Sequence, residues 1–199
     1  MPNAITIDGV ELSLIVERKQ VKNVNARLRG TTMMVSAPHK MPQSALDEAI
    51  ADLARRLVRR AHAQRVNQEE DAVALVQRIA ARFAGVVPRP PEVSTVLFVT
   101  TQQACWGSYS RTTKTIRLNA VLRRMPRWVL ESVVAHELAH VVHPDHSPAF
   151  WKLTRRVFPE TDRAQAFLAG VSWLGQHLAD LPPVERALLA DITDCDDQE

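Results

Sequence analysis

The segment HELAHVVHPDH, residues 136–146, constrains the fold most, because it holds four of the seven histidines and a glutamate directly after the first. On a helix, His136 and His140 lie one turn apart on the same face, so that both imidazoles can reach one ion. Glu137 is rotated by about 100° and can contact a water molecule on that ion without being a ligand. The spacing therefore predicts a metal-binding helix with an acid beside the metal.

We predict a third ligand at His146 and not at His143. By helical angle alone, His143 returns to nearly the face of His136, but it lies about 10 Å along the axis at a rise of about 1.5 Å per residue. It also precedes Pro144, and a residue before proline disfavours the helical conformation. The chain is expected to turn back there so that His146 completes the site, with Asp145 as a less favoured alternative.

Three imidazole ligands favour zinc and leave a fourth position for a water molecule, whose pKa falls to about 7. We therefore expect about one Zn²⁺ ion per chain, held by His136, His140 and His146. Glu137 is predicted to be the general base, which takes the proton of that water for attack on a carbonyl carbon. This chemistry is typical of a metallopeptidase that acts on a peptide or protein.

Two other interpretations of the histidine segment are a polar helix end with ordinary hydrogen bonds and a binding module with structural zinc. Structural zinc sites usually have four protein ligands and are rich in cysteine. Cys105, on a predicted strand, is the only cysteine that could contribute. A count of protein ligands separates the cases, because three ligands and a water support an enzyme and four protein ligands a module.

The order of hydrophobic patterns predicts an α+β fold with a small mixed or antiparallel sheet. Strand patterns cover residues 5–18, 24–38, 94–100, 104–110 and 114–119, and helical patterns cover residues 42–66, 69–85, 126–142, 147–158, 161–178 and 182–192. In the first helix, Ala45, Ala49, Leu53, Leu57 and Ala61 follow one face. Gly85 is expected to end the second helix.

The composition favours a soluble protein of the cytoplasm. The 199 residues contain no uncharged apolar run of about 18 residues, so no membrane span is expected, and the first residues lack the pattern of a signal peptide. The two cysteines, Cys105 and Cys195, are far apart in sequence and are interpreted as free thiols in a reducing compartment. The sequence carries no signal for the oligomeric state.

Charge is unevenly distributed: residues 1–130 are basic, and residues 191–199 hold five acids in an expected solvated tail. The predicted first helix and the second group of strands could together form a stripe that binds phosphates. Its members are Arg55, Arg56, Arg59, Arg60, Arg65, Arg111, Lys114, Arg117, Arg123, Arg124 and Arg127. A solvated face is the favoured interpretation, and a nucleic-acid-associated protease or binding module, with zinc mainly structural, is the alternative.

From Trp106 to Trp151 the sequence resembles the YgjP-like metallopeptidases, relatives of the SprT-like and Wss-type zinc proteases. The matching positions are Trp106, Gly107, Ser108, Tyr109, Ser110, Ile116, Leu118, Asn119, His136, Glu137, His140, His146, Ser147, Phe150 and Trp151. Tyr109 stands where this family often has cysteine. The resemblance implies a zinc-dependent peptidase with a zincin-like core, a small sheet plus an active-site helix, behind an N-terminal β-rich part.

With this resemblance we divide the chain into residues 1–66, the β-rich part and basic helix; 67–176, the catalytic core; and 177–199, a helix and acidic tail. In zincins a strand beside the metal helix pairs with substrate, so Trp106 and Tyr109 are candidates for substrate binding. His143 is a further candidate at the cleft. Phe150 and Trp151 are expected to pack in the core, and Asn119 is expected to cap the next helix.

Overall fold

The structure, a computed structural model, describes residues 3–69, 72–102 and 104–191 and has the predicted α+β class. The chain forms two compact units. The first comprises Met1–Arg78 and Glu92–Leu122, and the second comprises Ile79–Pro91 and Arg123–Glu199. The division of the chain at residues 66 and 176 stays a prediction, and the acidic tail at 192–199 lies outside the described residues.

The first unit begins with a mixed four-stranded sheet of order β1-β2-β4-β3. Its strands are β1 (Asn3–Ile7), β2 (Val10–Lys19), β3 (Asn25–Arg29) and β4 (Thr32–Pro38). Two antiparallel hairpins, β1–β2 and β3–β4, are joined by parallel pairing of β2 with β4. Gly30, in the turn between β3 and β4, has a φ of 58°, which glycine adopts without steric cost.

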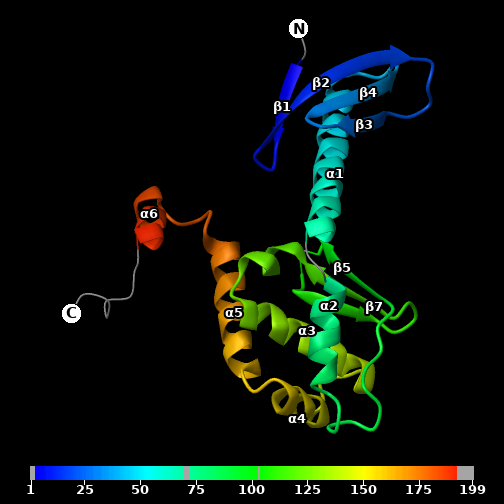
Figure 1. Cartoon of the computed structure of the whole chain (residues 1–199). Helices are drawn as coiled ribbons and strands as arrows, with labels where there is room; N and C mark the ends of the chain where they lie inside the picture. The colour runs from blue at the N-terminus through cyan, green and yellow to red at the C-terminus, as the bar shows by residue number, and fades with distance from the viewer. Residues whose placement is uncertain (1–2, 70–71, 103, 192–199) are drawn as a thin grey trace. The chain divides into compact units, whose positions relative to one another are not determined.

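Helix α1 (Gln43–Glu69) packs on one face of this sheet (Figure 1). The core between them is formed by strand residues such as Leu12, Met33 and Val35 and by helix residues Leu46 and Ile50. The buried face of α1 therefore lies one residue further along the chain than the alanine-rich face predicted from the sequence. Burial of Leu46 and Ile50 removes more apolar area from water than burial of Ala45 and Ala49, which explains the rotation.

A second, three-stranded sheet completes the first unit, with β5 (Thr95–Val99), β6 (Gly107–Ser110) and β7 (Thr115–Asn119) in the order β5-β7-β6. Strands β5 and β7 are parallel, and β6 pairs antiparallel with β7 as an edge strand. Asn119 is a helix cap, as predicted, but of a short 3-10 helix that was not predicted, η1 (Ala120–Arg124): its side chain accepts a hydrogen bond of 3.0 Å from the backbone N–H of Val121.

Helix α2 (Ala72–Ala81) ends four residues before Gly85, earlier than predicted. The backbone N–H groups of Arg82, Phe83 and Ala84 each bond to a carbonyl three residues back, which tightens the last turn. Phe83 is fully buried there, and this burial takes precedence over the propensity of residues 82–84 to continue the helix.

The second unit is helical, with α3 (Arg127–Val142), α4 (Pro148–Val157), α5 (Thr161–His177) and α6 (Pro183–Asp191). Trp128 of α3 meets Phe167 of α5 edge to face at 5.6 Å between ring centroids, and Arg155 of α4 forms an ion pair of 2.9 Å with Asp162 of α5. These contacts hold α3, α4 and α5 together.

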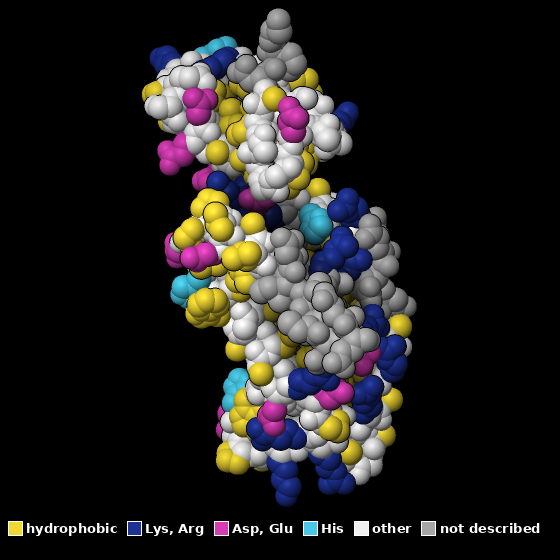
Figure 2. Space-filling view, turned by 90° about the vertical axis from the view of Figure 1, so that its left-hand side faces the viewer, with side chains coloured by type: hydrophobic (Ala, Val, Ile, Leu, Met, Phe, Trp, Pro, Cys, Tyr) yellow, Lys and Arg dark blue, Asp and Glu magenta, His cyan; other side chains and the backbone are white. Residues whose placement is uncertain are grey.

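Among the described residues, no helix has both the length and the apolar character needed to cross a membrane. Some hydrophobic side chains are nevertheless exposed, as the yellow atoms in Figure 2 show, and on α5 and α6 they include Trp173, Val184 and Leu188.

Candidate metal centre

Helix α3 carries His136, Glu137 and His140 in its last two turns and ends at Val142. His143 follows with an extended backbone, at φ −118° and ψ 113°. The helix therefore ends before Pro144, as predicted from the restriction that proline places on the preceding residue.

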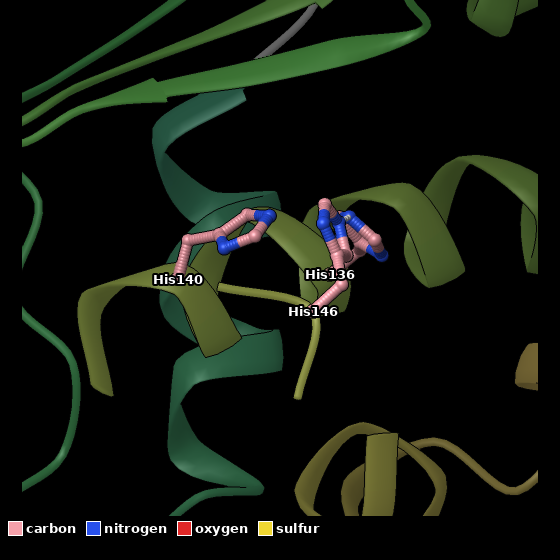
Figure 3. Close-up of side chains that lie close together, drawn as sticks. All are labelled: His136, His140 and His146. Atoms are coloured by element: carbon pink, nitrogen blue, oxygen red, sulfur yellow. Dashed lines mark hydrogen bonds between the residues drawn. The ribbon is translucent and has the colours of Figure 1, made fainter. Parts of the chain in front are cut away.

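The chain after α3 brings His146 back to the two histidines of the helix (Figure 3). The Nε2 atoms of His146 and His136 are 3.0 Å apart, and the ring centroids of His140 and His146 are 4.7 Å apart. One ligand nitrogen from each of the three histidines lies within 4.8 Å of the others. The structure thus brings together the three side chains that the sequence nominates as metal ligands.

This donor set fits zinc. In a tetrahedral site with zinc–nitrogen bonds of about 2.0 Å, two ligand nitrogens are separated by about 3.3 Å. The observed separations, 3.0 Å for one pair and at most 4.8 Å for the set, need only small side-chain rotations to meet that value. Among the described residues the group contains three histidines and no fourth protein ligand, so a coordination position is left for water or substrate.

His136 and His140 are held in the neutral form that binds metal. Burial, together with the neighbouring His140 and His146, lowers the pKa of His136 to about 4. Burial also lowers the pKa of His140, and the hydrogen bond from its ring to the backbone carbonyl oxygen of His143 partly offsets this. Both residues are therefore neutral near pH 7, and no proton has to leave them before a metal binds.

A backbone carbonyl orients the ring of His140. Its Nδ1 atom lies 3.2 Å from the carbonyl oxygen of His143. Because a carbonyl oxygen only accepts, Nδ1 donates in this hydrogen bond and Nε2 keeps its lone pair for a metal. Sequence reasoning missed this role of His143, since a backbone group leaves no signal in the residue type.

Glu137 is buried, with 5% of its surface exposed, beside the histidine group. Burial raises the pKa of its carboxyl group to about 8 in the metal-free protein, because desolvation disfavours the charged form. A cation bound at the neighbouring histidines would favour the carboxylate and lower this pKa again. The pKa of the Glu137 carboxyl group therefore lies close to neutral pH.

Helix α4 supports the three imidazoles from one side. Ser147 caps it by accepting a hydrogen bond from the backbone N–H of Phe150, and Pro148 occupies its first turn. The fully buried ring of Phe150 lies within 4.9 Å of all three histidine rings, measured between centroids. The expectation that Phe150 is a core residue is confirmed, whereas Trp151 is only partly buried and stacks on His146 at 5.6 Å.

Replacing Phe150 with alanine should cost about 3–5 kcal/mol of unfolding free energy and also weaken zinc binding, because its ring supports all three histidines. Phe158, buried at the end of α4, is the matched control, since none of its recorded ring contacts is to a histidine. Denaturant unfolding and competition with a chromogenic chelator measure the two effects. Equal loss of zinc affinity in the Phe150→Ala and Phe158→Ala variants would contradict the supporting role.

Trp106 and Tyr109 belong to the first unit, whereas the three histidines belong to the second. Both aromatic side chains are partly exposed, and Tyr109 lies on the edge strand β6. Their role in substrate binding stays a prediction, as does that of His143. Asp145, the alternative ligand, is exposed and lies outside the histidine group.

Two solved structures resemble parts of the chain. The metallopeptidase zymogen jannalysin of Methanocaldococcus jannaschii is 22% identical, with a TM-score of 0.39 over 51% of this chain and 96% of that one. The metallopeptidase zymogen abylysin of Pyrococcus abyssi is 20% identical, with a TM-score of 0.39 over 48% of this chain and 89% of that one. A comparison with curated proteins finds no match.

A family model describes the part of the chain that contains the histidine group. The model of the YgjP-like metallopeptidase domain matches residues 59–170, more than half of the 199 residues. The match runs from the middle of α1 into α5 and includes His136, Glu137, His140 and His146. By this match the chain belongs to the YgjP-like metallopeptidase family.

Proposed function

We propose that this protein is a zinc-dependent peptidase in which His136, His140 and His146 hold one zinc ion and Glu137 is the general base. The observation that carries the proposal is the convergence of three imidazole nitrogens within 4.8 Å next to a buried carboxyl group. Membership of a metallopeptidase family supports a peptide or protein as the substrate.

The residues around the histidines supply the acid–base chemistry of hydrolysis. When bound, zinc is a Lewis acid that polarises a carbonyl group and lowers the pKa of water. The carboxylate of Glu137 accepts the proton of the attacking water and delivers it to the leaving amine nitrogen. Burial excludes bulk water from this carboxyl group, which keeps its pKa high enough to take a proton and to give it back.

A structural zinc module, the competing function, has less support. A closed structural site needs four protein ligands, and the group formed by the described residues offers three. Cys105, the candidate for a sulfur ligand, is exposed and belongs to the first unit. An open coordination position is what a catalytic ion requires.

Metal removal tests the proposal directly. We expect about one zinc per chain by elemental analysis, and loss of peptidase activity on an unfolded protein substrate after treatment with a zinc chelator. Activity should return on addition of about one equivalent of Zn²⁺ and not on addition of Mg²⁺ or Ca²⁺, because these hard cations prefer oxygen ligands. Full activity without metal, or restoration by Mg²⁺ alone, would overturn the assignment of zinc.

A further inference from the structure

The second half of α1 is strongly basic. Residues 53–65 contain five arginines, Arg55, Arg56, Arg59, Arg60 and Arg65, and no aspartate or glutamate. Two pairs in this row, Arg55 with Arg59 and Arg56 with Arg60, have the i, i+4 spacing that places side chains on one face about 6 Å apart along the axis. These arginines belong to the first unit and have no part in the proposed hydrolysis.

A hollow of about 480 Å³ lies between this part of α1 and the end of β5. Its lining residues are Asp52, Arg55, Arg56, Arg59, Arg60, Ala63, Val99, Thr100 and Thr101. A second hollow of about 500 Å³ shares Arg59 and Thr100 with the first and is also lined by His62 and Arg65. We call the two together the α1 groove. Each is within the range of about 300–1,000 Å³ that is usual for ligand sites.

Hydrogen bonds fix the two walls of the α1 groove. The side-chain amide of Asn67, on α1, bonds to both the N–H and the carbonyl oxygen of Phe98 on β5, each at 2.8 Å. The hydroxyl group of Thr100 donates to the backbone carbonyl oxygen of Arg59 at 3.0 Å. All of these residues belong to the first unit, so the α1 groove is formed within one unit before any ligand binds.

The arginines of the α1 groove are only partly neutralised. Arg55 forms an ion pair with Asp52 and Arg59 with Asp8, each at 3.0 Å. Within the part of the chain that the structure describes, Arg56 and Arg60 are exposed and have no recorded ion-pair or hydrogen-bond partner. Two guanidinium groups are thus free to bind an anion, and the hydroxyl group of Thr101, which also lines the first hollow, can donate a further hydrogen bond.

We propose that the α1 groove binds the phosphodiester backbone of a single nucleic-acid strand. Guanidinium groups bind phosphate through two parallel hydrogen bonds, and threonine hydroxyl groups are common partners of backbone phosphates. A row of arginines suits a polymer that carries a charge at every repeat better than one isolated anion. The described lining residues include no Phe, Tyr or Trp, and His62 is their one aromatic ring, so contacts to the phosphates dominate and binding depends little on sequence.

Binding of a fluorescent oligothymidylate of about 20 nucleotides, followed by anisotropy, tests the proposal. If the two free guanidinium groups of Arg56 and Arg60 each contact a phosphate, affinity should fall roughly 7-fold between about 50 and 200 mM salt, and this salt dependence should be lost in the R56Q/R60Q variant. The matched control is R89Q/R186Q, which removes two exposed arginines from the second unit and should behave as the unaltered protein. Thermal unfolding shows whether each variant is folded.

Three outcomes would overturn the proposal. One is equal weakening of binding in R56Q/R60Q and in the control, which would assign the effect to net charge alone. Another is displacement of the oligonucleotide by polyglutamate or by inorganic phosphate at equal charge, which would make the α1 groove a general anion site. The last is tighter binding of a duplex than of the single strand. Stronger binding of the single strand, with loss of affinity and salt dependence only in R56Q/R60Q, supports it.

Discussion

Replacing Glu137 with glutamine should lower peptidase activity by about two powers of ten or more while about one zinc per chain stays bound. The amide keeps the size of the side chain but cannot accept the proton of the attacking water. Zinc should stay, because the three histidine nitrogens that converge do not include Glu137. Elemental analysis and cleavage of an unfolded protein substrate measure the two quantities on the same sample.

Glu131→Gln is the matched control for this experiment, since Glu131 lies on the same helix and makes ion pairs with Arg82 and Arg127. It should retain both zinc and activity, at some cost in stability. Loss of zinc together with activity in Glu137→Gln would show that Glu137 is a ligand, and undiminished activity would show that another group is the base. The inactive variant would also retain substrates, so capture followed by identification of the bound peptides can define the cleavage preference.

Local patterns predicted most of the secondary structure, whereas pairings between distant segments did not follow from them. The patterns of residues 5–18 and 24–38 predict strands, which the structure confirms and pairs as two antiparallel hairpins. The parallel pairing of β2 with β4 depends on contacts between segments that no local pattern specifies. The end of α2 was misplaced for a similar reason, because burial of Phe83 is a tertiary effect.

The histidine group was predictable because its chemistry requires particular residue types at fixed spacing. The surroundings of the histidine group were less predictable. The desolvation of Glu137 and the contact of Phe150 with all three imidazoles follow from packing. The α1 groove likewise could not be predicted from the sequence. The sequence indicates a basic helix, but the hollow exists only because β5 lies beside α1 and is bonded to it through Asn67.

Removal of the His146 ring should abolish tight zinc binding, whereas removal of the His143 ring should not. His146 contributes one of the three converging nitrogens and enters from the segment after α3, so no other side chain replaces it when the ring is cut back to alanine. Loss of a ligand should cost more than the roughly 10–100-fold in affinity that follows loss of an outer-shell partner.

His143 is the matched control because it is a histidine three residues before His146 that contacts the site through its backbone. Its carbonyl oxygen accepts the hydrogen bond from Nδ1 of His140, and an alanine at this position keeps that carbonyl. The extended backbone of His143 also ends the helical row in which His136 and His140 lie, so its ring is not required for the histidine group. His143→Ala should therefore bind zinc as the unaltered protein does in competition with a chelator. Retention of zinc by His146→Ala with loss in His143→Ala would reverse the assignment of the third ligand and refute the prediction that the chain turns back at Pro144.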